Sequence, residues 1–255
     1  MKNSYDFFAV DYHRKRKYHW RDLEEFLDDL KRRNFRFHGF NLDLGCANGR
    51  NFNLFLHSDS RLIGIDKSKA LLNLARERLK SQNQGLKVNT KFVDLILSDI
   101  NALPLRPFSI TNAFSIATFH HLNNEIDRRN VLSQLCSILK KDGFLLLTVW
   151  RRYQKKYRYY FIADKIKRLF MPRYSRTQER LGLSNYGDKY IPWTLSSRKA
   201  TYNRFYHFFS QKEIKTLLKT YKLIIISKKG GPNKKDNFFI LTQKVNKNLQ
   251  QNDVY

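Results

Sequence analysis

The chain has 255 residues, a length that suits one large domain with a sizeable hydrophobic core. Its 49 lysine and arginine residues against 22 acidic residues give a formal net charge of +27 at pH 7. A positive field of this size attracts polyanions, so the charge favours nucleic acid as a partner. The alternative is that the basicity reflects an AT-rich genome and selects no ligand.

The cysteine content and the hydropathy pattern exclude two classes of protein. Two cysteines, Cys46 and Cys136, are too few for a disulfide framework or a Cys-only metal site, so we expect no metal and a cytoplasmic location. No apolar run approaches the roughly 20 residues of a membrane span, and the N-terminus has no signal-peptide pattern. A secreted disulfide scaffold and a membrane partner are therefore not expected.

Apolar segments alternate with helical patterns along the first 150 residues. Residues 4–32 predict an aromatic and basic arm that leads into a helix. Strands are then expected at 40–45, 61–66, 91–99, 112–119 and 144–150, and helices at 49–57, 69–79 and 125–139. This alternation predicts a doubly wound, Rossmann-like α/β fold with a seven-stranded, mostly parallel sheet, once two closing strands are added.

The segment from 151 to 200 differs from the preceding residues in its hydropathy pattern and its charge. It shows no clear period and carries 14 lysines and arginines against three acidic residues. A basic insertion of this length after the fifth strand indicates a functional surface, and a solvated charge run is the alternative. Beyond it, Ser210 to Glu213 form a capping box that opens a helix, and strands at 223–227 and 237–242 follow around a Gly-Gly-Pro turn.

A glycine-rich loop, Asp43-Leu-Gly45-Cys-Ala47-Asn-Gly49, lies where the first strand meets the first helix. Glycines there allow a sharp turn and a close approach to a ligand. The spacing also occurs in dinucleotide sites, but Asp43 would repel a pyrophosphate and the third dinucleotide glycine is missing. Asp66 and Asp99 end the next two strands, where carboxylates suit the ribose and the adenine side of an adenosyl group.

This constellation resembles the class I S-adenosylmethionine-dependent methyltransferases over residues 39–150. The resemblance implies S-adenosylmethionine as the cofactor, bound by Asp43, Gly45, Ala47, Gly49, Asp66, Asp99, Ile100, Ile116 and Ala117. It also implies a single methyltransferase domain over 1–255, made of an arm (1–35), a cofactor-binding core (39–150), a basic substrate-side insertion (151–205), a closing helix with strands (206–245) and a tail (246–255).

A narrower resemblance extends over nearly the whole chain. The motifs Ser115-Ile-Ala-Thr-Phe-His120-His121-Leu, Val149-Trp150, Pro192-Trp193 and Arg204-Phe-Tyr206-His207 resemble the tRNA wobble-uridine carboxymethyl methyltransferases, including the methyltransferase domain of the AlkB-homologue tRNA enzymes. The N-terminal Tyr5-Asp-Phe-Phe and the closing Asp236-Asn-Phe-Phe add to it. The resemblance implies a tRNA substrate, esterification of 5-carboxymethyluridine at the wobble position, and a small zinc-ribbon activator protein as partner.

The implied reaction makes modest demands on the site. A carboxylate is ionised at neutral pH, so no general base is needed, and the site must hold the oxygen in line with the methyl group. Arg204 is the first choice for the cation that holds the carboxylate. We expect the catalytic residues to be Arg204, His120, Tyr206 and Trp150, and the substrate-binding residues to be Arg16, Lys17, Arg151, Arg152, Trp193 and His207.

Two other functions remain open on the sequence. One is a small-molecule methyltransferase of the quinone or lipid type, and the other is a catalytically silent adenosyl-binding RNA module. Trp150 and His120 also have a structural interpretation, as a core aromatic and a satisfied buried histidine. After the fifth strand, Arg151-Arg-Tyr-Gln replaces the small and acidic residues usual in the carboxymethyluridine family, so the substrate is the least determined part of the prediction.

Overall fold

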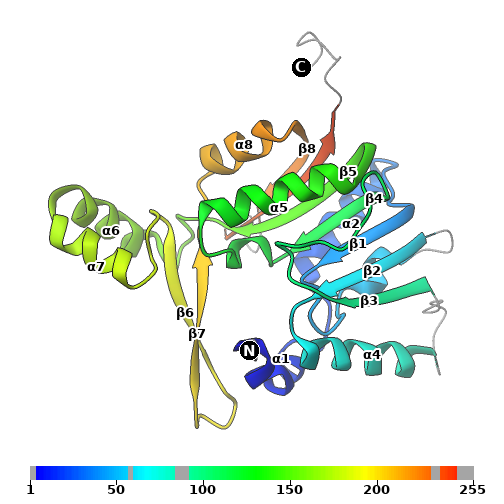
Figure 1. The fold of residues 1–255 in the computed structure, drawn as a ribbon, viewed down its shortest axis with the longest axis horizontal. Coiled ribbons are helices and arrows are strands. Elements are labelled where there is room, and N and C mark those ends of the chain that lie inside the picture. Colours follow the sequence, from blue (N-terminus) through cyan, green and yellow to red (C-terminus); the bar gives the residue numbers. More distant parts are fainter. Residues whose placement is uncertain (1–3, 57–59, 84–91, 231–235, 246–255) are drawn as a thin grey trace.

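A computed structural model describes residues 4–56, 60–83, 92–230 and 236–245. Its centre is a seven-stranded sheet of order β3-β2-β1-β4-β5-β9-β8 (Figure 1). Neighbouring strands from β3 to β5 run parallel, whereas β9 is antiparallel to both β5 and β8. The predicted doubly wound, mostly parallel sheet is confirmed.

The strands of this sheet are β1 (Gly39–Leu44), β2 (Ser60–Asp66), β3 (Val93–Leu97), β4 (Ile110–Ile116), β5 (Leu139–Trp150), β8 (Leu223–Gly230) and β9 (Asn237–Lys244). The helices that pack around it are α2 (Arg21–Arg32), α3 (Phe52–Phe55), α4 (Lys69–Asn83), α5 (Glu125–Ile138) and α8 (Gln211–Thr220). No helix in the described part of the chain is long and apolar enough to cross a membrane.

Two apolar clusters bury the faces of the sheet. Leu132 and Leu135 of α5 pack with Leu218 of α8 on one face. Phe26 of α2 and Leu72 of α4 pack on the other. Because the strands are apolar toward both sides, helices must cover both faces, and the carboxyl ends of the parallel strands remain for a ligand.

Several predicted elements differ in length from the observed ones. The helix expected at 49–57 is reduced to Phe52–Phe55, because Gly49 turns with a φ of 67°. The strand expected at 112–119 ends at Ile116, where Ala117 adopts a φ of 54° and the chain makes a 3₁₀ turn, η3 (Phe119–His121). The capping box at Ser210 is confirmed. The Gly-Gly-Pro turn lies largely outside the described residues.

The segment without a clear period is regular in the structure. It forms α6 (Arg158–Phe170), α7 (Pro172–Arg180) and β6 (Asp188–Thr194), and β6 pairs with β7 (Thr201–His207) in a separate two-stranded sheet. At the N-terminus, η1 (Ser4–Phe8) and α1 (Ala9–Lys15) lie between the hairpin and α4 (Figure 1). The arm and the β6–β7 hairpin therefore flank the open end of the parallel strands.

Candidate active site

A cavity of about 470 Å³ lies at the carboxyl ends of β1, β2, β4 and β5. It spans the point where strand order reverses between β1 and β4, the usual ligand position in open α/β sheets. Seven of the nine expected cofactor residues line it: Gly45, Ala47, Asp66, Asp99, Ile100, Ile116 and Ala117. The lining does not include Asp43, which is buried, or Gly49, which packs on the Phe52 ring.

The loop after β1 is held in a strained backbone conformation. Ala47 has a φ of 50°, and the same positive sign occurs at Ala117, which follows β4. Non-glycine residues adopt this region rarely and at a cost of about 1–3 kcal/mol, so such positions concentrate at functional sites. Gly45 also has a positive φ, and a Cβ there would collide with the Thr118 side chain.

Asp66 fixes this loop and faces the cavity. Its Oδ2 accepts a hydrogen bond from the Ala47 N–H at 2.9 Å, and its Oδ1 accepts one from the Ser68 N–H at 2.8 Å. Each carboxylate oxygen keeps a further lone pair. The residues at the end of β2 therefore fit a ligand with vicinal hydroxyls, such as the ribose of an adenosyl group.

Carboxyl groups gather at the buried end of the loop. Burial and, to a smaller extent, the nearby Asp66 raise the pKa of Asp43 to about 8, with Arg50 opposing the shift. Burial also raises the pKa of Asp66, although its two backbone hydrogen bonds oppose this shift. The same desolvation, together with these two carboxyls, raises the pKa of the Cys46 thiol well above its usual value. A ligand with a positively charged group nearby would favour the ionised form of these carboxyl groups.

The opposite side of the cavity is cationic. Arg204 of β7 lies over the Trp193 and Tyr206 rings, at 4.7 and 5.1 Å from the ring centroids. Its Nε is buried and has no hydrogen-bond partner in the described part of the chain. Arg16 lines the same cavity, and within the described residues neither guanidinium forms an ion pair. The two side chains are available to an anionic ligand.

Three rings form one wall of the cavity. Tyr206 stacks on His120 with 4.9 Å between ring centroids and packs against Trp150 at 4.5 Å. Burial, followed by the neighbouring His121, lowers the pKa of His120 well below its usual value, so this imidazole is neutral near pH 7. Its Nδ1 is buried without a partner among the described residues. The wall offers an apolar face and one free imidazole nitrogen.

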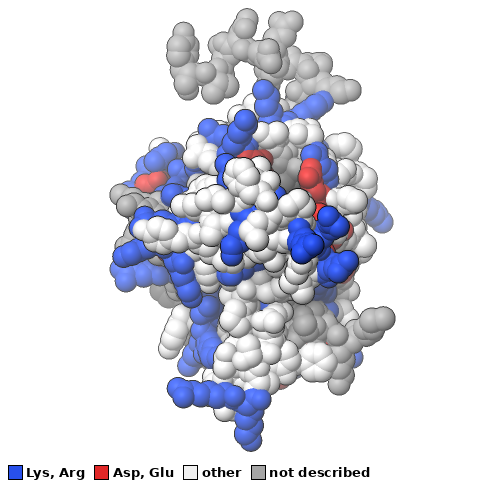
Figure 2. All heavy atoms as spheres, turned by 90° about the vertical axis from the view of Figure 1, so that its left-hand side faces the viewer, with Lys and Arg blue, Asp and Glu red and all other residues white. Residues whose placement is uncertain are grey.

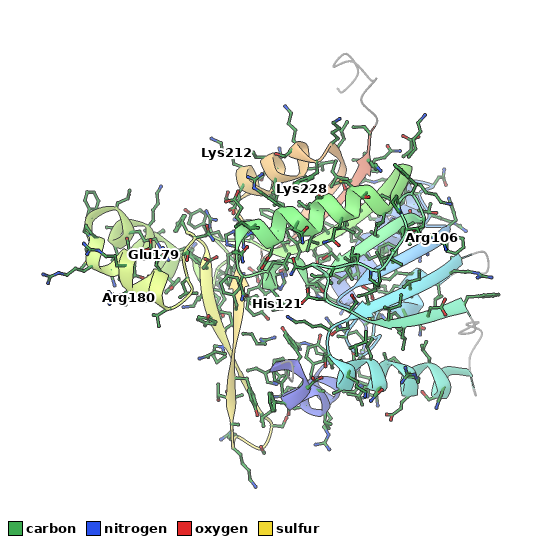
Figure 3. The ribbon with its side chains drawn as sticks, viewed as in Figure 1. Arg106, His121, Glu179, Arg180, Lys212 and Lys228 are labelled. Atoms are coloured by element: carbon green, nitrogen blue, oxygen red, sulfur yellow. The ribbon has the colours of Figure 1, made fainter. Side chains whose placement is uncertain are left out.

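His121 is a cavity residue to which the sequence assigned no role. Its Nδ1 lies 2.8 Å from the Phe205 carbonyl oxygen, which only accepts, so Nδ1 carries the proton. Nε2 then accepts from the Tyr5 hydroxyl at 3.2 Å. Burial lowers the pKa of His121 to about 3, in agreement with this neutral tautomer. Figure 3 shows His121 between the sheet and the N-terminal arm, where it joins the arm to β7.

The arm is attached to both sides of the cavity. Asp6 accepts hydrogen bonds from the Ser68 hydroxyl and the Ala70 N–H at the start of α4. Asp11 accepts from the Trp193 indole and the Ser196 N–H, each at 2.8 Å. These contacts place Tyr5, Tyr12 and Arg16 of the arm in the lining of the cavity. Of these three, only Arg16 was predicted from the sequence as a site residue.

The four expected catalytic residues all line the cavity, but most of the expected substrate-binding residues do not. Arg152 and His207 lie outside the lining, buried in an internal network. Arg152 forms an ion pair with Glu213, and the two His207 ring nitrogens each lie 2.6 Å from a carboxylate, of Asp188 and Glu213. Trp193 packs against the arm instead. Arg151 and Lys17 also lie outside the lining.

Comparisons with known proteins agree with this geometry. Residues 42–147 match the family described as a methyltransferase domain. A protein of Encephalitozoon cuniculi that is named as a methyltransferase is 30% identical over 146 residues, which are 57% of this chain and 60% of that protein. The tRNA (carboxymethyluridine(34)-5-O)-methyltransferase of Schizosaccharomyces pombe is 26% identical over 220 residues, 85% of each chain. Relatives of the same name in Arabidopsis thaliana and Xenopus tropicalis are longer, and the match spans 32% and 20% of their lengths.

Solved structures show the same fold. A Haloferax volcanii complex that contains the Trm112 methyltransferase activator superposes with a TM-score of 0.62 at 14% identity, covering 96% of this chain and 97% of that one. Residues 42–147 are thus similar to methyltransferase domains, and solved S-adenosylmethionine-dependent methyltransferases share the fold of this chain. Within this class, the relatives named above confirm the resemblance to the carboxymethyluridine methyltransferases.

Proposed function

We propose that this chain methylates tRNA, and that it esterifies the carboxymethyl group of the wobble uridine. The observation that carries the proposal is the Arg204 guanidinium beside the aromatic wall, whose buried Nε has no hydrogen-bond partner among the described residues. An anionic substrate group next to a base suits this arrangement. The names of the Schizosaccharomyces, Arabidopsis and Xenopus relatives support the same substrate.

The proposed mechanism divides the work between the two sides of the cavity. The bound cofactor supplies an electrophilic methyl group. Asp66 and the strained loop hold the adenosyl end, while Arg204 and Arg16 hold the substrate carboxylate. A bidentate guanidinium contact fixes both oxygens, so that one points along the line of transfer. Because the carboxylate is already ionised, the neutral His120 is not required as a base.

The uracil ring is proposed to stack on the aromatic wall formed by Trp150, Tyr206 and His120. Stacking of a base on an aromatic side chain is generally worth about 1–3 kcal/mol. Burial raises the pKa of Tyr206 to about 12, so its hydroxyl stays protonated and can donate to the base or to the carboxylate. These contacts select a planar substrate that carries an acid.

A basic surface beside the cavity is proposed to hold the tRNA backbone. Figure 2 shows lysine and arginine side chains spread over the face that contains α6, α7 and the hairpin, with few acidic ones. Lys155 and Lys156 are exposed and follow Gln154, which lines the cavity. Phosphate contacts fix register without reading sequence, so these lysines would seat the anticodon stem while the pocket selects the nucleoside.

An activator of the zinc-ribbon type is proposed as a partner. The Haloferax volcanii structure supports it, since that complex contains the Trm112 methyltransferase activator. The strand β3 lies at one edge of the sheet, a position at which a strand can pair with a second chain. The assay below therefore includes the chain with and without such a protein.

The decisive experiment is transfer of labelled methyl from S-adenosylmethionine to bulk tRNA that lacks the wobble ester, followed by nucleoside mass spectrometry. We expect label in 5-methoxycarbonylmethyluridine, with the activator present. Labelled tRNA with another modified nucleoside would refute the carboxymethyl assignment. No labelled RNA with or without activator, despite tight cofactor binding, would refute the tRNA proposal and favour a small-molecule substrate.

A further inference from the structure

Helix α6 carries an apolar stripe that faces solvent. Tyr159, Ile162, Ile166, Leu169 and Phe170 are between 47% and 77% exposed. In Figure 1 the α6–α7 pair projects beyond the β6–β7 ribbon, away from the seven-stranded sheet. Contiguous apolar groups of this size on a surface mark an interaction site.

The spacing within the stripe is that of a helix–helix seam. Tyr159, Ile162, Ile166 and Leu169 follow one another at intervals of three, four and three residues, as positions a and d of a heptad do. At 100° per residue, these side chains and Phe170 occupy a sector about 100° wide. The pattern is therefore that of a helix prepared to pack lengthwise against another helix.

The opposite face of α6 is already used. Phe161 is fully buried with Phe208 and Ile191, and Asp164 accepts hydrogen bonds from Arg168 and Tyr174. These residues anchor α6 to the hairpin and to α7. The exposed stripe is thus not needed to attach the helix to its own chain, and a partner can bind it without displacing a core contact.

Charges beside the stripe indicate the character of the partner. Arg158 and Lys165 occupy the g positions of the same heptad register, and both are exposed. The α6–α7 pair exposes six cations, Arg158, Lys165, Lys167, Arg173, Arg176 and Arg180, and one acidic residue, Glu179. Figure 3 shows Glu179 and Arg180 on the projecting pair. Charges at e and g positions select the partner in coiled coils, so the complementary helix is acidic.

We propose that α6 is a docking helix for a partner protein, which contributes an apolar helix bordered by aspartate and glutamate. Branched aliphatic side chains such as Ile162 and Ile166 interdigitate with a facing helix, whereas they offer RNA neither a ring nor a hydrogen bond. A second copy of this chain would bring like charges together at the g positions. The surface does not depend on the proposed tRNA reaction.

The probes for this proposal are two synthetic peptides of three heptads, with leucine at a and d. One has glutamate at e and g, and the other has lysine there. Fluorescence anisotropy with the full chain should show saturable binding of the acidic peptide, weaker at high salt, and no binding of the lysine peptide. Failure of the acidic peptide to bind, or equal binding of both peptides, overturns the proposal.

Surface variants locate the binding. The double variant Ile162→Ser/Ile166→Ser should raise the dissociation constant of the acidic peptide at least tenfold. Ile126→Ser, at an even more exposed isoleucine on α5, should leave it unchanged. Arg158→Glu/Lys165→Glu should transfer the preference to the lysine peptide. Since all five side chains are exposed, unchanged thermal unfolding midpoints will show that each variant is folded.

If the apolar stripe binds something other than an acidic helix, the same Ile162→Ser/Ile166→Ser variant gives a different result. Loss of self-association in sedimentation would assign the stripe to a second copy. Weaker binding of tRNA, or of phosphatidylglycerol vesicles, with peptide binding unchanged would assign it to RNA or lipid. Each of these outcomes refutes an acidic helix as the partner.

Discussion

The two sides of the cavity differ in how the chain assembles them. On the proposed cofactor side, Gly45, Asp66 and Asp99 each lie at or just after the end of a strand of one parallel sheet, so the sheet itself brings them together. On the proposed substrate side, Arg16 comes from the N-terminal arm and Arg204 from the β6–β7 hairpin, and contacts such as that of Asp11 with Trp193 bring the two segments together. The cofactor side is therefore a property of the fold, and the substrate side is a property of tertiary docking between distant segments.

Removal of the substrate-side cation should give the largest effect. Arg204→Ala should lower the rate of methyl transfer about 100- to 1,000-fold, the usual range for loss of one charge-stabilising donor. The dissociation constant for S-adenosylmethionine, measured by calorimetry, should stay unchanged. Arg204→Lys should restore only part of the rate, because an ammonium cannot hold both carboxylate oxygens. An Ala variant with the normal rate would remove Arg204 from the proposed mechanism.

On the cofactor side we expect the opposite result, with cofactor affinity lost and tRNA binding retained. Asp66→Ala removes two acceptors for the ribose and the carboxylate that holds Ala47, so affinity for S-adenosylmethionine should fall about 100-fold or more. Circular dichroism should show the same secondary structure as the unchanged chain. Binding of tRNA by filter retention should persist, since the basic surface is intact. Calorimetry with unaltered cofactor affinity would mean that the cavity holds the adenosyl group differently.

The basic surface should contribute less and in a salt-dependent way. Lys155→Ser/Lys156→Ser should weaken tRNA binding about tenfold and reduce the slope of log affinity against log salt by about 0.7–0.9 per lysine removed. The control is Lys140→Ser/Lys141→Ser, an equally exposed pair at the start of β5, far from the cavity. If both pairs changed the slope alike, attraction would be general and the surface beside the cavity would have no special role.

The smallest expected effect concerns stability. The pKa of Asp43 rises from 3.8 in the unfolded chain to about 8 in the folded one, so the folded state holds a proton that the unfolded state releases. Stability is then lost as the pH rises from about 4 to about 8. Asp43→Asn should raise the unfolding midpoint by a few degrees at pH 8 and much less at pH 5, measured without cofactor. Equal shifts at both pH values would show that Asp43 does not titrate in this range.

The same contrast explains what the sequence revealed. The loop at Gly45 and the acids at Asp66 and Asp99 were predictable, because parallel strands place their carboxyl ends together wherever the strand order is known. Tyr5, Tyr12 and His121 were not predicted as cavity residues, since their positions depend on how the arm docks. Arg152 and His207 were expected to bind the substrate, but both contact Glu213 outside the lining, and this contact between distant segments cannot be predicted from the sequence.

The helices of the basic insertion were not predicted from the sequence, for a related reason. Helix periodicity is recognised when apolar residues follow one face, and α6 places Phe161 on the buried face and Ile162 and Ile166 on the exposed one. Because apolar residues occur on both faces of the helix, the sequence shows no single helical period. The β6–β7 hairpin was hidden in the same way. Pro192 interrupts its alternation of apolar and polar residues, and several of its aromatic residues pack outside the main sheet.

Cys46 gives the cofactor loop a resistance to oxidants. The thiolate is the form that attacks peroxides and alkylating reagents, and the raised pKa of Cys46 keeps this thiol protonated near pH 7. It is also buried, so a reagent reaches it only when the loop opens. Burial raises the pKa of Cys136 to about 11, so this half-buried thiol is also protonated near pH 7. The rate at which Cys46 is modified therefore measures the opening of the loop, not the chemistry of the thiol.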